Sequence, residues 1–182
     1  DNSRGVQRNT RSIMRCDVDP CDVSPIDLPV FAEFTGLKWY QCENWDFGPS
    51  HGGGPSAVAI TGGKDSIFPR VTRAENTDGI KRYRKVFGKN VGVSDWNEFY
   101  INIIKNANQS FSRDHTAIAK GTLTDDMFDK PNDADFSSTR AGPFTCAVGD
   151  YFALWIRQEL YAGGTNPQRG QDIVIQIELM ED

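Results

Sequence analysis

The sequence has no long hydrophobic run and few of the residues from which metal and catalytic centres are built. No apolar stretch approaches the roughly 20 residues that a helix needs to cross a bilayer, and the chain does not open on a signal-peptide pattern. Among 182 residues there are only two histidines and four cysteines. We therefore expect no membrane partner, and few groups are available for metal-dependent or nucleophilic chemistry.

The cysteines do not have the spacing of a structural zinc site, which usually shows two close pairs of ligands. Cys16 and Cys21 form one loose pair, whereas Cys42 and Cys146 have no near companion. The sequence predicts no metal ion and no other cofactor. We expect buried or idle thiols, with a Cys16–Cys21 disulfide as the less favoured alternative.

Catalytic motifs are also missing. No G-x-S-x-G turn occurs, and His51 and His115 lie in polar stretches typical of loops. Gly52-Gly53-Gly54 is not followed by the Lys-Ser/Thr of a phosphate-binding loop. The five aspartates between Asp125 and Asp135 do not follow the EF-hand pattern, so a solvated acidic loop is favoured over a calcium site. The sequence predicts a protein that is not an enzyme.

Charge is distributed unevenly along the chain. The first 15 residues carry a net charge of +3, which leaves −8 on residues 16–182. An acidic body lacks the clustered basic face that nucleic acids require, so no specific nucleic-acid partner is expected. The basic segment is either a solvated, mobile terminus or an arm that orders against an acidic partner and ties two subunits together. Its arginines are Arg4, Arg8, Arg11 and Arg15.

Residues 16–29 contain three prolines and four aspartates. This composition excludes a helix and a central strand, so the segment is predicted to be an extended linker. We therefore divide the chain into an extended basic arm with a Pro/Asp-rich linker at residues 1–29 and one β-sandwich domain at residues 30–182.

The second half of the chain shows the alternation of apolar and polar residues that is typical of β-strands. In residues 96–104, Phe99, Ile101 and Ile103 share one face, and the same period of two marks residues 151–160 and 173–179. Thr72 and Glu75 form a capping box, which predicts one helical turn at 73–78. Shorter strands are expected at 30–40, 57–61 (buried), 81–89 and 116–120, and Gly142-Pro143 is expected to lie in a connection between strands.

About seven short strands with almost no helical periodicity predict an all-β fold, an antiparallel β-sandwich of the jelly-roll or Ig-like type with an extended N-terminal arm. One strand is strongly basic, since five Lys and Arg residues surround Tyr83 and Phe87 at positions 81–89. Such interleaving occurs in proteins that bind single-stranded nucleic acid. Lysine and arginine also block pairing at exposed sheet edges, and this second interpretation is favoured.

Two separated stretches of the chain resemble motifs of known proteins. Tyr83-Arg84-Lys85-Val-Phe87 with Lys89-Asn90 follows Ile67-Phe68-Pro-Arg-Val-Thr-Arg-Ala-Glu75, and Trp155-Ile156-Arg157-Gln158 comes near the end. They resemble the motifs Y-R-x-x-[YF]-x-K-N and W-I-R-[RQ] of tailed-bacteriophage virion structural proteins. The resemblance covers residues 65–182, and Gln158 departs from the usual second arginine of the latter motif.

The resemblance implies a non-enzymatic accessory protein of the virion with a β-sandwich fold, which decorates or stabilises the capsid or tail. Its partners would be capsid or tail subunits and further copies of itself in a homo-oligomer. Because Trp, Tyr and Arg are the commonest anchors of interfaces, the motif residues are candidates for partner binding; alternatively, they fix the sandwich itself. The candidates are Tyr83, Arg84, Trp155 and Arg157, together with the arginines of the arm.

A second function remains open at this point. Sandwiches with exposed aromatic residues often bind sugars, so the chain is alternatively a carbohydrate- or receptor-binding module of a tail or baseplate. The residues that would serve this function are Trp39, Tyr40, Trp45 and Trp96.

Overall fold

The computed structural model describes residues 11–15, 36–45, 52–61, 67–69, 72–105, 114–163 and 172–179. Within these ranges the strands are β1 (Arg11–Arg15), β2 (Leu37–Cys42), β3 (Pro55–Ala59), β4 (Ile80–Asn90), β5 (Trp96–Lys105), β6 (Asp114–Gly121), β7 (Arg140–Cys146), β8 (Tyr151–Leu160) and β9 (Asp172–Leu179). The helices are α1 (Arg73–Asp78) and the short 3-10 turn η1 (Asp133–Asp135).

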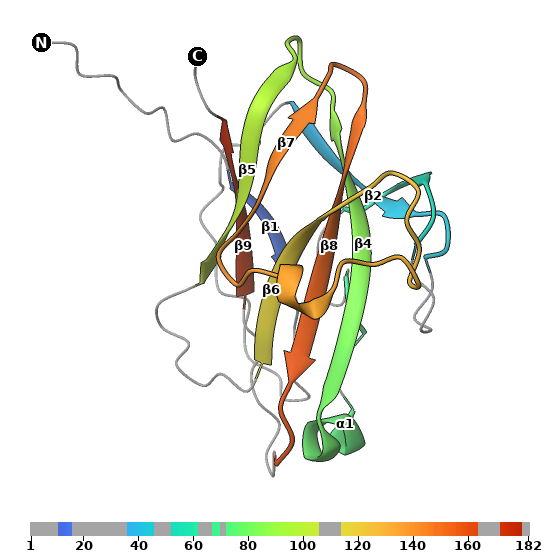
Figure 1. Cartoon of the computed structure of the whole chain (residues 1–182), viewed down its shortest axis with the longest axis vertical. Helices are drawn as coiled ribbons and strands as arrows, with labels where there is room; N and C mark the ends of the chain where they lie inside the picture. Colours follow the sequence, from blue (N-terminus) through green and yellow to red (C-terminus); the bar gives the residue numbers. More distant parts are fainter. Residues whose placement is uncertain are drawn as a thin grey trace, which may run out of the picture.

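The strands form two antiparallel sheets that pack against each other (Figure 1). The five-stranded sheet has the order β3-β2-β4-β8-β6, and the four-stranded sheet has the order β1-β9-β5-β7. The prediction of an all-β antiparallel sandwich is confirmed. No helix in the described part of the chain has the length and hydropathy needed to span a membrane.

The order of the strands separates the two predicted types of sandwich. From β4 to β9, each strand lies in the opposite sheet from the one before it. In immunoglobulin-like sandwiches, by contrast, several consecutive strands pair within one sheet. Winding back and forth between two sheets is the arrangement of a jelly roll. Strands β2 and β3 extend the five-stranded sheet beyond β4.

The core between the sheets is built on aromatic rings. Phe99 of β5 stacks on Phe144 of β7 with centroids 5.3 Å apart, and it meets Phe152 of β8 edge-on at 4.9 Å. Gly88 of β4 leaves room for this cluster, since a Cβ at that position would lie 2.1 Å from the Phe152 ring. The predicted inward face of β5, which carries Phe99, Ile101 and Ile103, is buried as expected.

The basic strand does not lie at an edge. Strand β4 is in the middle of the five-stranded sheet, paired with β2 on one side and β8 on the other. The interpretation of its lysines and arginines as edge protection is therefore wrong. The physical reason is that Arg84 and Lys85 are buried and bound by partners inside the domain, so polarity did not indicate exposure in this strand.

Two further expectations need correction, and one is confirmed. The strand expected to be buried at 57–61 is β3. It is an edge strand that pairs with β2 on one side only, and its Ala57–Ala59 segment is exposed.

Gly142-Pro143, which was expected in a connection between strands, lies within β7. The pairing of β7 with β5 shifts its register there, and a bulge of this kind at a sheet edge tolerates proline. The predicted capping box at the start of α1 is present, with Glu75 N–H donating to Thr72 Oγ1 at 3.2 Å.

The part of the arm that the structure describes joins a sheet. Strand β1 pairs antiparallel with β9 at the edge of the four-stranded sheet, so that Arg11 lies opposite Gln176 and Arg15 opposite Asp172. Arg4 and Arg8 lie outside the described residues. The same holds for the linker at 16–29, for Cys16, Cys21 and His51, and for the domain boundary at residue 30, which therefore stays a prediction.

Candidate functional site

The connection between β6 and β7, residues 122–139, is called here the covering loop because it crosses the outer face of the five-stranded sheet (Figure 1). Phe136 of this loop packs with Trp155 of β8 and with Ala117 and Ala119 of β6. Trp155 points away from the core between the sheets and is nevertheless fully buried. The covering loop thus adds a third layer to the sandwich.

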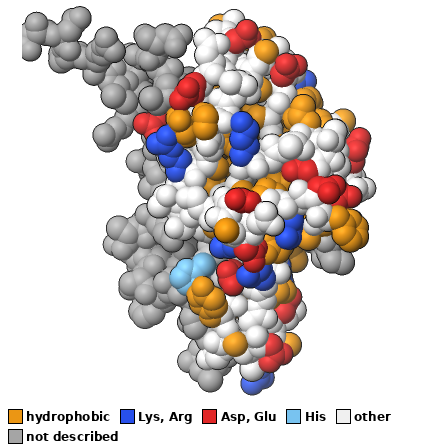
Figure 2. Space-filling model, viewed as in Figure 1, with side chains coloured by type: hydrophobic (Ala, Val, Ile, Leu, Met, Phe, Trp, Pro, Cys, Tyr) orange, Lys and Arg blue, Asp and Glu red, His pale blue; other side chains and the backbone are white. Residues whose placement is uncertain are grey.

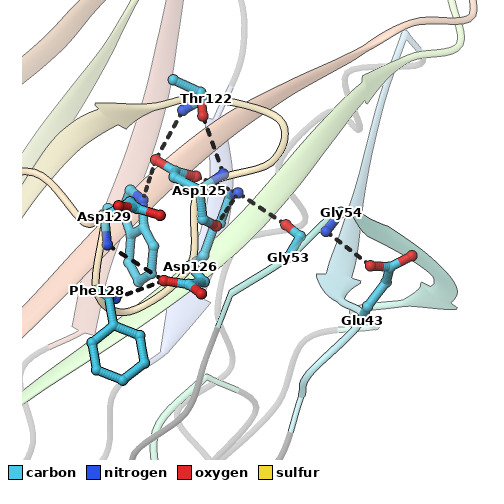
Figure 3. A network of polar contacts seen from close by, with 10 residues as sticks. Glu43, Gly53, Gly54, Thr122, Asp125, Asp126, Phe128 and Asp129 are labelled. Carbon is cyan, nitrogen blue, oxygen red and sulfur yellow. Dashed lines mark hydrogen bonds and ion pairs between the residues drawn. The ribbon is translucent and has the colours of Figure 1, made fainter.

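The covering loop is fixed first at a buried position, called here the buried anchor, where the side chain of Lys85 binds Asp125 and Gly53. Figure 3 shows Asp125 and Gly53 at this position. Lys85 Nζ donates to the main-chain oxygen of Asp125 at 2.8 Å and to that of Gly53 at 2.9 Å. The ammonium group also forms an ion pair with Asp125 Oδ1. The exposed fractions of the two side chains are 0% for Lys85 and 7% for Asp125, so water hardly reaches this pair.

The second carboxylate oxygen of Asp125 is held by two N–H groups. Trp155 Nε1 donates to Oδ2 at 3.0 Å, and the backbone N–H of Thr122 donates to the same atom at 3.0 Å. The backbone of Asp125 is bound as well, because its N–H donates to Thr122 Oγ1 and its carbonyl accepts from Gly53 N–H. The whole carboxylate is therefore fixed in position.

Burial dominates the electrostatics of this anchor. It lowers the pKa of Lys85 below its usual value, although Asp125 opposes the shift by stabilising the ammonium form. The rings of Phe87 and Trp155 lie 4.9 Å and 6.0 Å from Lys85 Nζ, which keeps the surroundings apolar. Burial also raises the pKa of the nearby Cys42 thiol.

The covering loop is fixed a second time at the surface, at what is called here the exposed anchor. The Tyr83 hydroxyl donates to Asp133 Oδ1, Lys81 Nζ lies 2.9 Å from Oδ2, and Arg157 Nη1 donates to the Asp133 main-chain oxygen at 3.0 Å. Figure 2 shows basic and acidic side chains intermixed on this face.

These contacts shift the pKa values of the exposed anchor. The hydrogen bond from Tyr83 is the largest cause and that from Lys81 the next, and together they lower the pKa of Asp133 to about 2. Burial, followed by the bond to Asp133, raises the pKa of Tyr83 to about 12.

Three of the predicted partner-binding residues lie close together, but they contact the covering loop of their own domain. Tyr83, Trp155 and Arg157 all contact the covering loop. Arg84 points to the other side of β4, where it is 1% exposed and its guanidinium lies 4.7 Å from the Trp45 ring centre. Burial corrects the expectation for Arg84 and Trp155, since neither side chain is accessible to a partner. These contacts favour the alternative that the motif residues fix the sandwich itself.

The acidic loop is also less solvated than predicted. Asp125 is buried, because it balances Lys85 in a site that the sequence pattern does not indicate. Among the described residues, no group of three or more His, Cys, Asp or Glu side chains is placed to hold a metal ion. Cys42 and Cys146 are free and buried.

The end of the sandwich away from α1 carries two turns (Figure 1), each with an exposed valine. The two turns together are called here the tip, which consists of residues 91–95, between β4 and β5, and residues 147–150, between β7 and β8. Val93 is fully exposed and Val148 about half exposed. A hollow of about 320 Å3 beside them is lined in part by Asp95, Trp96, Cys146, Asp150 and Tyr151.

The tip is held rigidly by Asn90, which is completely buried. Asn90 Nδ2 donates to the main-chain oxygens of Ser94 at 2.9 Å and of Cys146 at 3.1 Å, and Oδ1 accepts from Gly92 N–H at 2.9 Å. The two turns are joined directly as well, since Val148 N–H donates to Asp95 Oδ1 at 2.7 Å. Asn90 is the last residue of the Y-R-x-x-[YF]-x-K-N motif, so the asparagine of this motif has a structural role in this chain.

The aromatic residues suggested for sugar binding are largely unavailable. Trp39 and Trp96 are buried in the core between the sheets, which corrects that expectation for both. Tyr40 and Trp45 are half-buried, and Tyr40 packs edge-on against Tyr151 with ring centres 5.6 Å apart.

Comparison with known proteins identifies no relative of this chain. A scan of protein-family models, a search of curated proteins and a search of solved structures each find no match to this chain.

Proposed function

We propose that this protein is a non-enzymatic structural component of a tailed-phage virion, which docks through its tip onto neighbouring capsid or tail subunits, including copies of itself. The observation that carries the proposal is the pair of exposed valines, Val93 and Val148, on two turns that are fixed to each other. The proposal takes these two valines as parts of one contiguous apolar surface, which is the kind of surface that marks sites of protein association.

The rigidity of the tip favours docking for an energetic reason. Association costs free energy when loops must be ordered, and a surface that is already fixed avoids this cost. Asn90 and Asp95 hold the two turns through hydrogen bonds within the domain. Val93 and Val148 therefore meet a partner in a preset geometry.

The fold and the sequence motifs support the assignment to a virion. Jelly rolls are the architecture of many viral capsid domains and of lectins, so the fold supports the assignment by analogy. The resemblance to tailed-phage structural proteins rests on motif residues that in this chain build the scaffold: Tyr83, Trp155 and Arg157 hold the covering loop, and Asn90 holds the tip.

The direct test of location is peptide mass spectrometry of gradient-purified particles of the phage whose genome encodes the chain. We expect peptides of this protein in fixed ratio to the major capsid or tail protein. Their absence from infectious particles would contradict the assignment to the virion.

The docking surface is tested by changing the tip. The double variant Val93→Asp/Val148→Asp should lose self-association in sedimentation velocity and occupancy on purified particles, because charge on the tip opposes apolar contact. Val58→Asp on β3 is the matched control, since Val58 is also exposed but lies outside the tip. Equal behaviour of the two variants would contradict docking through the tip.

A further inference from the structure

The buried anchor holds an amine directly against a carboxyl group, at a position where neither reaches solvent. We propose that Lys85 Nζ and Asp125 Cγ condense to form an intramolecular isopeptide bond, which locks the covering loop covalently onto β4. The two residues are 40 positions apart in the sequence. This inference does not rest on the proposed function.

The surroundings of Lys85 Nζ orient it as a nucleophile. Two of its N–H groups are directed to the main-chain oxygens of Gly53 and Asp125, and its remaining direction faces the Asp125 carboxyl group. Asp125 Oδ1 is in direct ion-pair contact with Nζ. The nitrogen is therefore already held beside the carboxyl group whose carbon it would attack.

The surroundings of Asp125 prepare it as the electrophile. When an amine adds to a carboxyl carbon, negative charge develops on one oxygen, and donors already directed at that oxygen stabilise the transition state. Asp125 Oδ2 has two such donors, Trp155 Nε1 and the Thr122 N–H, each at 3.0 Å. Oδ1, which faces Lys85 Nζ, is left as the oxygen that takes up protons and departs.

Burial favours the reacting form of Lys85. In an apolar site the neutral amine gains relative to the ammonium form, and the lowered pKa of Lys85 follows from this cause. Lysines that are desolvated in this way are the ones that act as nucleophiles in proteins. The rings of Phe87 and Trp155 exclude the water that would hydrolyse the product.

The condensation balances without any further reactant. A proton passes from the Lys85 ammonium group to Asp125 Oδ1, which gives an amine and a carboxylic acid. The lone pair of the amine forms the N–C bond, a second proton passes from nitrogen to Oδ1, and the C–Oδ1 bond breaks to release one water molecule. Nothing is oxidised or reduced, and the N–H that remains on the amide still has the Gly53 or Asp125 carbonyl as an acceptor.

The test is the intact mass of the purified full-length protein, followed by tryptic digestion. We expect a mass that is one water molecule below the mass calculated from the sequence. We also expect a joined peptide pair that contains Lys85 and Asp125 and is not cleaved after Lys85. A full sequence mass, or a loss of water without this joined pair, would overturn the proposal.

Variants assign the lost water to this site. Lys85→Arg and Asp125→Ala should have the full mass, whereas Lys81→Arg should keep the loss, because Lys81 pairs with Asp133 in contact with solvent. Asp125→Asn is the sharpest variant: its condensation releases ammonia in place of water and yields the same joined peptide pair. Trp155→Phe should reduce the condensed fraction at a fixed time after synthesis, because it removes one donor to Oδ2. Persistence of the lost water in Lys85→Arg would contradict the proposal even if the wild-type mass agreed.

Discussion

Strand β4 carries two Lys–Asp pairs that reach the same covering loop and differ most in burial. Lys85 and Asp125 are 0% and 7% exposed, whereas Lys81 and Asp133 are 37% and 48% exposed. The buried carboxylate is bound by an indole and a backbone N–H, and the exposed one by a phenol and two cationic side chains. Both pairs join an ammonium group to a carboxylate, so exposure to solvent is the main difference between them, beside the neighbouring donors.

Solvent gives the two pairs different tasks. Water and salt compete for the exposed pair, and pairs of this kind contribute about 0–1 kcal/mol. A buried pair gains little over apolar residues of the same size, but removal of one partner leaves an uncompensated charge in the interior. The buried anchor therefore determines whether the covering loop stays in place, and the exposed anchor adds only a small contribution to its stability.

The largest effect is expected from Lys85→Met, which leaves the Asp125 carboxylate buried with neither the ammonium partner nor the covalent bond to Lys85. The free energy of unfolding should fall by at least about 3–5 kcal/mol, measured by denaturant titration. Lys81→Met is the matched control on the same strand and should cost at most about 1 kcal/mol. Equal losses for the two variants would show that burial does not separate the pairs.

A smaller effect is expected from Trp155→Phe, which keeps the aromatic ring and removes one N–H donor from Asp125 Oδ2. A buried acceptor that loses its donor costs about 1–3 kcal/mol. Tyr83→Phe makes the matching change at the exposed anchor, since it removes the donor to Asp133 Oδ1, and it should cost less because water replaces the hydroxyl. Thermal unfolding of both variants ranks them, and a larger loss for Tyr83→Phe would contradict this ranking.

The smallest effect is expected on the stability of the folded protein at acidic pH. The pKa of Asp133 is about 2 in the folded protein, below its ordinary value of 3.8. A lowered folded pKa means that the contribution of this carboxylate is complete above the ordinary value and is lost as the pH falls towards about 2. Because Asp133 is exposed, screening should keep this contribution below about 1 kcal/mol.

Asp133→Asn checks this assignment in acid. Its stability should depend less on pH between 4 and 2 than that of the wild type, since the amide does not titrate. Unfolding curves at several pH values give the slope directly. An unchanged slope would assign the acid sensitivity to other carboxylates.

Regular alternation made much of the sandwich predictable. Phe99, Ile101 and Ile103 face the core as the period of two indicates, and the capping box of Thr72 and Glu75 placed α1. These signals are local, so the sequence alone carries them. The pairing of β4 between β2 and β8 was not local, and the basic residues of this strand were wrongly taken as a sign of a sheet edge.

The buried anchor could not be predicted from the residues that form it. Lys85 lies in a run of basic residues and Asp125 in a run of acidic ones, so each looks like a solvated charge. Their burial depends on a contact across 40 residues of chain and on the covering loop that shields Trp155. One signal was available, since Trp155 stands on the outward face of β8, where a large apolar side chain indicates that something covers it.

Native-state hydrogen exchange of individual backbone amides tests most directly whether the buried anchor holds the covering loop in place. Thr122 and Gly53 donate their N–H groups to Asp125, whereas Phe128 lies in an exposed part of the same loop. We predict that Thr122 and Gly53 exchange as slowly as amides of β4 in the wild type and in Lys81→Met, and that they exchange rapidly in Lys85→Met. Exchange at Thr122 and Gly53 as fast as at Phe128 in the wild type would contradict the account.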